Sequence, residues 1–246
     1  MASRFAGFPA GMMKFFRDLD RNNNREWFQD HKSVYEEMVK APMTELVERV
    51  NAELAKFAPD HINEPKKAIY RIYRDTRFSK DKTPYKTHVG AIFPRRGLEK
   101  HSCGSYYFHV SPKEFLIAGG AYMPGKDELF TLRTHLAGRA GECRKLAGAK
   151  KLRSLMGELR GEQLARTPKG FPSDHPDAGL LRNKQWYFYT DLEPKLATTP
   201  DLEKELLKRF RVMQPFIDFL NAPLVARKRD TQPDPRSTFP MPSARR

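Results

Sequence analysis

The sequence predicts an α+β fold in which a central, mainly antiparallel sheet is packed by N-terminal and C-terminal helices. Apolar residues follow helical spacing near both ends of the chain and alternate as in strands through the middle. They make up 39% of 246 residues, which is enough for a core. The connections between the expected strands are too short for helical crossovers, and this favours antiparallel pairing.

The N-terminal part is expected to be helical. Residues 9–20 are amphipathic, and the asparagines at 22–24 can end that helix and cap the next one, over residues 25–39. Pro42 suits the first turn of a third helix. The core stripe of that helix has helical spacing: Met43, Leu46, Val47, Val50 and Leu54.

The strands are expected between about residues 67 and 123 and again at 184–191. The first region divides into candidates at 68–75, 87–94, 105–110 and 115–123, and the last two read as a hairpin. Gly119-Gly120 within the hairpin indicates a bulge or the close approach of another group.

The remaining helices are expected after residue 125. Short helices are predicted at 126–136, 142–146 and 180–182, whereas residues 152–159 fit helix and strand equally well. A long C-terminal helix over 199–220 should be kinked or split at Pro215.

Length and composition indicate the domain organisation and the cellular compartment. We expect one domain over residues 5–224, followed by a basic, proline-rich and disordered tail at 225–246. No apolar run is long enough to span a membrane, and the N-terminus lacks the pattern of a secretory signal. Two cysteines far apart in the sequence fit a reducing compartment, so a cytoplasmic protein is expected. The sequence indicates no oligomeric state.

The net charge of +15 is unevenly distributed. Residues 66–100 hold eleven lysines and arginines against three acidic residues. Within them, residues 71–86 place six basic residues, two aspartates and three aromatics in sixteen positions. Two acids cannot neutralise six bases, so part of this charge should face solvent or an anion. We call residues 71–86 the signature loop.

Eight residues of the signature loop match the pattern R-x-x-R-D-x-R-F-x-x-x-(D/N)-K-x-x-Y: Arg71, Arg74, Asp75, Arg77, Phe78, Asp81, Lys82 and Tyr85. With this pattern the chain resembles the bacterial domain-of-unknown-function family DUF 2461. The resemblance extends over residues 5–224 and includes the segments 22–28, 120–124, 168–171 and 174–176. It implies a cytosolic, single-domain α+β protein and supplies no known activity.

The signature loop is the first candidate site. Arginine forks match carboxylate and phosphate oxygens, so Arg71, Arg74, Arg77 and Lys82 are predicted to bind a small anion. If there is chemistry, Asp75, Asp81 and Tyr85 are the acid–base candidates. The other interpretation is structural: the two aspartates pair with neighbouring arginines and fix the loop.

A second loop, residues 167–176, offers Lys169 and His175, and Arg182 follows it. These residues could extend an anion pocket, although a proline-rigidified connection is the favoured interpretation of the loop. His88, His101, Cys103 and His109 have no spacing typical of a metal site, so no metal is predicted. No nucleophile elbow, phosphate-binding glycine loop or dinucleotide motif is present, and no cofactor is expected.

Three functions remain open at this point. The first is binding of a small anionic, phosphate- or carboxylate-bearing ligand, with enzymatic activity undecided. The second is nucleic-acid binding, through basic residues interleaved with aromatics and through the basic tail. The third is a protein-interaction domain whose basic surface meets an acidic partner.

Overall fold

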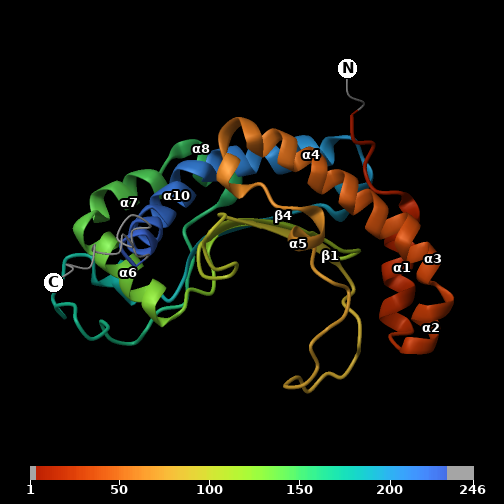
Figure 1. Cartoon of the computed structure of the whole chain (residues 1–246), viewed down its shortest axis with the longest axis horizontal. Helices are drawn as coiled ribbons and strands as arrows, with labels where there is room; N and C mark the ends of the chain where they lie inside the picture. The colour runs from red at the N-terminus through yellow and green to blue at the C-terminus, as the bar shows by residue number, and fades with distance from the viewer. Residues whose placement is uncertain (1–3, 232–246) are drawn as a thin grey trace, which may run out of the picture.

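Helices α4 and α10 lie along one face of a four-stranded sheet, and the middle of the opposite face is left open beneath an arch (Figure 1). The structure is a computed structural model and describes residues 4–231. In chain order its elements are α1 (Ala10–Arg21), α2 (Arg25–Asp30), α3 (Lys32–Tyr35), η1 (Glu36–Lys40), α4 (Ala41–Phe57), η2 (Pro59–His61), α5 (Pro65–Ala68), β1 (Val89–Pro94), β2 (Gly104–Val110), β3 (Phe115–Ala121), α6 (Lys126–Gly138), α7 (Ala140–Ala147), α8 (Lys150–Met156), α9 (Ala178–Arg182), β4 (Trp186–Leu192), η3 (Pro194–Thr198) and α10 (Asp201–Thr231).

The sheet has the order β1-β2-β3-β4, and every neighbouring pair is antiparallel. The predicted α+β class is therefore confirmed. Side chains alternate between the two faces of each strand. In β2, Tyr106, Phe108 and Val110 are fully buried under the helices, while Tyr107 and His109 belong to the open face.

Two of the N-terminal helices, α2 and α4, begin where the sequence predicts. The side chain of Asn24 accepts a hydrogen bond of 2.9 Å from the Trp27 backbone N–H and caps α2. Pro42 lies in the first turn of α4, and the predicted core stripe of α4 is completely buried. The single helix expected over 25–39 is instead divided into α2, α3 and the π-helix η1.

Two glycines of β3 allow the layers to approach closely. A Cβ at Gly119 would lie 2.8 Å from Sδ of Met213 on α10. Gly120 has φ +130°, and a Cβ there would overlap the carbonyl oxygen of Trp186 on β4. The predicted close approach at this pair is confirmed, because only glycine leaves room for both neighbours.

The segment expected as a first strand at 68–75 was wrongly predicted. It contains only the isolated bridges Ile69↔Ala91 and Tyr73↔Tyr85, after the short helix α5. The alternation arose because Ile72 packs into the core between exposed neighbours, without a continuous partner strand. The ambiguous stretch at 152–159 contributes to helix α8.

Helix α10 extends beyond the predicted 199–220 and is not split at Pro215, because it runs without a break through Pro215 and Pro223 to Thr231. An interior proline costs roughly 3 kcal/mol. Buried side chains on both sides of Pro215, Met213 and Ile217 among them, hold the helix against the core and offset that cost. Residues 225–231 belong to α10, and residues 232–246 lie outside the described part, so the basic tail stays a prediction. No helix within residues 4–231 is long and apolar enough to cross a bilayer.

Candidate functional site

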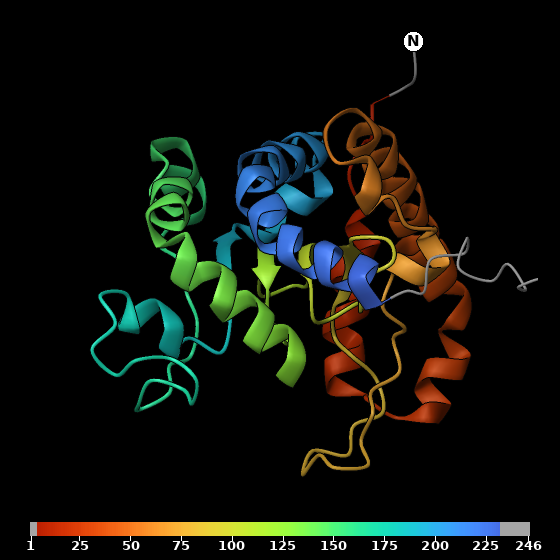
Figure 2. The same ribbon diagram turned by 60° about the vertical axis from the view of Figure 1, so that its left-hand side comes forward.

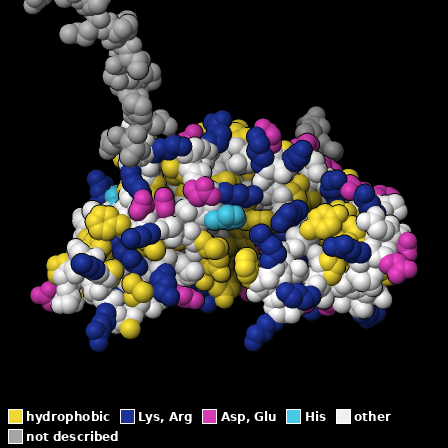
Figure 3. All heavy atoms as spheres, turned by 60° about the horizontal axis from the view of Figure 1, so that its bottom comes forward, with side chains coloured by type: hydrophobic (Ala, Val, Ile, Leu, Met, Phe, Trp, Pro, Cys, Tyr) yellow, Lys and Arg dark blue, Asp and Glu magenta, His cyan; other side chains and the backbone are white. Residues whose placement is uncertain are grey.

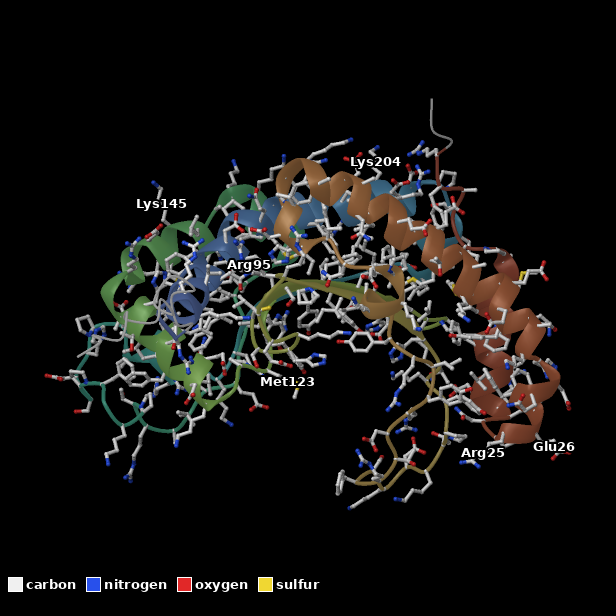
Figure 4. All side chains as sticks on the ribbon, viewed as in Figure 1. Arg25, Glu26, Arg95, Met123, Lys145 and Lys204 are labelled. Carbon is white, nitrogen blue, oxygen red and sulfur yellow. The ribbon has the colours of Figure 1, made fainter. Side chains whose placement is uncertain are left out.

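The open face of the sheet carries a cavity of about 560 Å³. Figure 3 shows it as a hollow with a hydrophobic interior, with a histidine at its margin and lysine and arginine side chains on both sides. Met123 lies below the sheet, on the α6 side of this space (Figure 4). A volume of this size is typical of sites that enclose a small molecule.

The register of the strands explains why the face is hollow. Pairing across the sheet places Ala118 between Tyr107 and Tyr189. In the adjacent row, Gly120 is paired with Tyr187. The small residues of β3 leave space at the centre, and tyrosines from β2 and β4 line the sides.

One wall comes from the segments that flank β1. The rings of Tyr70 and His101 are stacked with centroids 6.1 Å apart. Nζ of Lys86 lies 5.4 Å and Nζ of Lys100 lies 4.8 Å from the centroid of Tyr70. Burial lowers the pKa of both lysines, and it raises the pKa of Tyr70 to about 12. Of the two lysines, Lys86 lines the cavity, so this wall combines an aromatic surface with a partly desolvated cation.

A chain of hydrogen bonds lies at the end of the cavity near the β2–β3 turn. The Tyr107 hydroxyl is 2.9 Å from Nδ1 of His109, and Nε2 of His109 is 2.7 Å from Oε1 of Glu114. The ring of His88 lies 4.9 Å from that of His109. Burial, followed by the charges of His109 and Lys86, lowers the pKa of His88 to about 4. His88 is therefore neutral at pH 7.

The opposite wall is formed from β4 and its neighbours. Nη1 of Arg160 donates a hydrogen bond of 3.1 Å to the Tyr189 hydroxyl, and its guanidinium carbon lies 4.2 Å from the centre of that ring. The rings of Tyr122 and Tyr187 meet edge to face at 5.1 Å. Among the described residues that line the cavity are five tyrosines, three histidines and one lysine, and none is an aspartate or glutamate.

Family comparison covers this whole region. The family model described as "Conserved hypothetical protein (DUF2461)" matches residues 11–219, which include every residue lining the cavity. The chain belongs to this family. The predicted resemblance is thus confirmed at the level of the family. No curated protein and no solved structure matches the chain.

In this chain of the DUF2461 family, both aspartates of the signature loop are paired with arginines of the same loop. Arg74 donates to Asp81 and Thr83, and Arg77 forms an ion pair of 2.8 Å with Asp75. Lys82 Nζ donates to the Thr76 carbonyl at 2.9 Å. These contacts correspond to the structural interpretation of the loop, although the loop remains exposed to solvent.

The acid–base candidates of the loop are poorly suited to carry protons at neutral pH. Hydrogen bonds from Arg77 lower the pKa of Asp75 to about 2. Hydrogen bonds from Thr83 and Arg74 do the same for Asp81. Tyr85 is buried, with its ring stacked 4.2 Å from that of Phe28. Arg71 is exposed, and its backbone carbonyl accepts a hydrogen bond of 2.7 Å from Lys86.

The second predicted loop does not join the first. Figures 1 and 2 show the segment around residues 165–178 beside α6 and the signature loop across the open face from it. Nδ1 of His175 accepts a hydrogen bond from the Asp177 backbone, and Lys169 is exposed. Nε of Arg182 is buried without a hydrogen-bond partner. None of the predicted ligand-binding residues lines the cavity, and their role remains a prediction.

The metal interpretation finds no geometric support in the part of the chain that the structure describes. Within residues 4–231, no group of three or more histidine, cysteine, aspartate or glutamate side chains is placed to hold an ion. Cys103 is buried, and burial raises the pKa of its thiol. His88 and His109 contribute to the cavity as neighbouring rings.

The residues that line the cavity were missed for lack of a local signal. Tyr107 and Tyr189 come from separate segments outside any charge-dense run, and Tyr70 and Lys86 stand only at the two ends of the signature loop. The available signal was the alternation in β2, which separates Tyr107 and His109 from the core residues of that strand. The small residues of β3, read against that alternation, would have indicated a hollow on the open face.

Proposed function

We propose that this protein binds a small molecule with an aromatic or other apolar body and an anionic group, in the cavity on the open face of the sheet. The observation that carries the proposal is the composition of that cavity: about 560 Å³, lined by tyrosines and histidines, with lysine on one wall. An anionic ligand is also what the sequence led us to expect. The proposed site is the cavity, whereas the sequence pointed to the signature loop.

The apolar body of the ligand is supported by the surfaces that face the cavity. Tyr107, Tyr187 and Tyr189 offer ring faces and edges, and Ile92 and Leu116 add aliphatic surface. Aromatic pairs contribute about 0.5–1.5 kcal/mol beyond the burial of their area. A flat ring placed over Ala118 would contact tyrosines on two sides.

The anionic group is supported by the wall at Tyr70. The ammonium of Lys86 has three N–H donors, and one of them is directed to the Arg71 carbonyl. Burial and the nearby charges of Arg71 and Lys100 lower the pKa of Lys86, so an anion beside it would relieve an unfavourable concentration of positive charge. With no carboxylate among the described lining residues, nothing in the cavity competes with that anion.

The test compares two lysines, one inside and one outside the cavity. Phenyl phosphate, 4-hydroxybenzoate and adenosine monophosphate would be titrated by calorimetry against the wild type, Lys86→Gln and Lys82→Gln. A charge-assisted hydrogen bond contributes about 1.5–3 kcal/mol, so Lys86→Gln should weaken binding of an accepted probe by at least tenfold. Lys82→Gln should bind as the wild type does.

Two results would contradict this proposal. One is binding of none of the three probes by the wild type at millimolar concentration. The other is loss of binding in Lys82→Gln but not in Lys86→Gln, which would return the anion site to the signature loop. Thermal unfolding of both variants without ligand is the control for folding.

A second candidate function rests on the tip of the signature loop. Phe78 is 93% exposed, and the guanidinium carbon of Arg77 lies 5.6 Å from its ring centre. An exposed ring among cations is the pattern with which proteins stack bases of single-stranded nucleic acid. Phe78→Ala should then weaken binding of a labelled oligothymidylate by about tenfold at low salt. Equal binding by variant and wild type would exclude this role for the loop.

A further inference from the structure

The hydrogen-bonded side chains of Tyr107, His109 and Glu114 are arranged as a hydroxyl, a base and a group that orients the base, as in an activated nucleophile. Tyr107 and His109 are two residues apart on the open face of β2, so their side chains stand side by side. Glu114 is held by the turn that follows: its backbone N–H donates to Oγ of Ser111 at 3.0 Å, and its carbonyl accepts from the Ser111 N–H at 2.9 Å. The three groups therefore come from one hairpin with a fixed turn.

The direction of these hydrogen bonds follows from the carboxylate at one end. An ionised carboxylate can only accept, so the 2.7 Å contact with Glu114 places the proton of neutral His109 on Nε2. The lone pair on Nδ1 is then available, and the Tyr107 hydroxyl donates to it across 2.9 Å. A hydroxyl beside a base that is itself oriented by a third group is the diagnostic geometry of nucleophilic catalysis.

We infer that Tyr107 is the nucleophile of a group-transfer site, with His109 as its general base and Glu114 as the residue that positions His109. The inference rests on the proposed cavity, because all reacting atoms would meet there. As the Tyr107 oxygen forms a bond to an electrophilic centre, its proton moves to Nδ1 of His109. The leaving group departs with its bonding electron pair. Glu114 remains a carboxylate and faces the imidazolium that forms.

The surroundings fit this division of roles. Burial raises the pKa of Tyr107, and the charges of Tyr70 and Glu114 act in the same direction, so little phenolate exists without a base. His88 is neutral at pH 7 and adds no charge that would oppose an imidazolium at His109. His109 is largely shielded from solvent, with 11% of its side chain exposed, so bulk water is a poor competitor for its lone pair.

The test uses an uncharged electrophile, benzenesulfonyl fluoride, on the full-length chain. Attack by a tyrosine oxygen forms an O–S bond, releases fluoride and leaves an adduct that peptide mass spectrometry can locate. General-base assistance contributes on the order of 10²-fold or more. Tyr107 should therefore be labelled on the order of 10²-fold faster than Tyr187, a tyrosine of the same cavity without a histidine partner among its described contacts.

Variants assign the roles. His109→Gln should bring the labelling of Tyr107 down to the rate of Tyr187, and Tyr107→Phe should abolish it at that position. For Glu114→Gln, nitrogen NMR of the imidazole gives a separate readout. The wild type should show His109 protonated at Nε2, and Glu114→Gln should lose that tautomer preference together with labelling.

The inference is overturned if Tyr107 of the wild type is labelled no faster than Tyr187, a comparison that needs no variant to fold. It is also overturned if His109→Gln, with an unchanged circular dichroism spectrum, labels as fast as the wild type. Because the probe carries no charge, its reaction does not require anion binding, and Lys82→Gln, outside the cavity, should be labelled as the wild type is. Failure of anion binding and failure of the nucleophile are therefore separate outcomes.

Discussion

His88 makes the stability of this protein dependent on pH. Its pKa falls from 6.5 to about 4 on folding, first because of burial and then because of the charges of His109 and Lys86, while Glu114 opposes the change weakly. Between these two values the unfolded chain holds a proton that the folded chain does not. The contribution of His88 to the free energy of unfolding is therefore fully present above pH 6.5 and is lost as the pH falls toward 4.

The size of the effect follows from the shift. At about 1.4 kcal/mol per pKa unit, full titration would remove roughly 3 kcal/mol from the free energy of unfolding. At pH 5 the unfolded chain is almost fully protonated at this position and the folded chain is not, so roughly 2 kcal/mol is already lost. This is a large part of the 5–15 kcal/mol typical of a folded protein.

Urea unfolding of the wild type and of His88→Asn, each at pH 7.5 and pH 5.0, measures this contribution. Burial also lowers the pKa of His61, His101 and His135, so the wild type should lose additional stability at pH 5.0. Those three remain in the variant, and the difference between the two proteins isolates His88. The variant should lose roughly 2 kcal/mol less than the wild type. Equal losses in the two proteins would refute the desolvation of His88 beside His109.

Two further substitutions and one control variant test the packing around the sheet, all by urea unfolding at neutral pH. Gly120→Ala should lower the free energy of unfolding by on the order of 3 kcal/mol or more, because a Cβ would overlap the Trp186 carbonyl at a φ that L-residues rarely adopt. The control is Gly141→Ala, in helix α7 with open space around it, which should leave the free energy of unfolding unchanged or raise it by up to about 1 kcal/mol. Asn221→Ala should cost about 2–4 kcal/mol, because the buried Asn221 amide bonds both the N–H and the carbonyl of Gly104.

Much of the fold is encoded locally and could be predicted. The core stripe of α4 and the alternation of Tyr106, Phe108 and Val110 depend only on the period of each element. The same reasoning failed for residues 68–75, because Ile72, buried between two exposed neighbours, imitates the alternation of a strand. Whether such a segment pairs over its whole length depends on a partner far away in the chain, which no local period records.

The site was harder to predict for a different reason. Charge density identified the signature loop correctly as unusual, but a sequence does not show which charges neutralise one another. Arg77 turns back on Asp75 two residues away, and Arg74 reaches Asp81 across the loop. The cavity, in contrast, depends on long-range register, which brings Tyr107 of β2 and Tyr189 of β4 to either side of β3.

The backbone of the signature loop connects the loop's ion pairs with the wall of the cavity. Its arms are tied together where the Arg74 N–H donates to the Pro84 carbonyl and the Lys86 N–H donates to the Ile72 carbonyl, both at 2.8 Å. Tyr70 and Lys86, at the base of these arms, form the cationic and aromatic wall of the cavity. The ion pair between Arg74 and Asp81 also joins the two arms, and neither residue lines the cavity. The paired charges of the signature loop therefore belong to the support of the candidate site, and the proposed binding surface lies at the base of the loop.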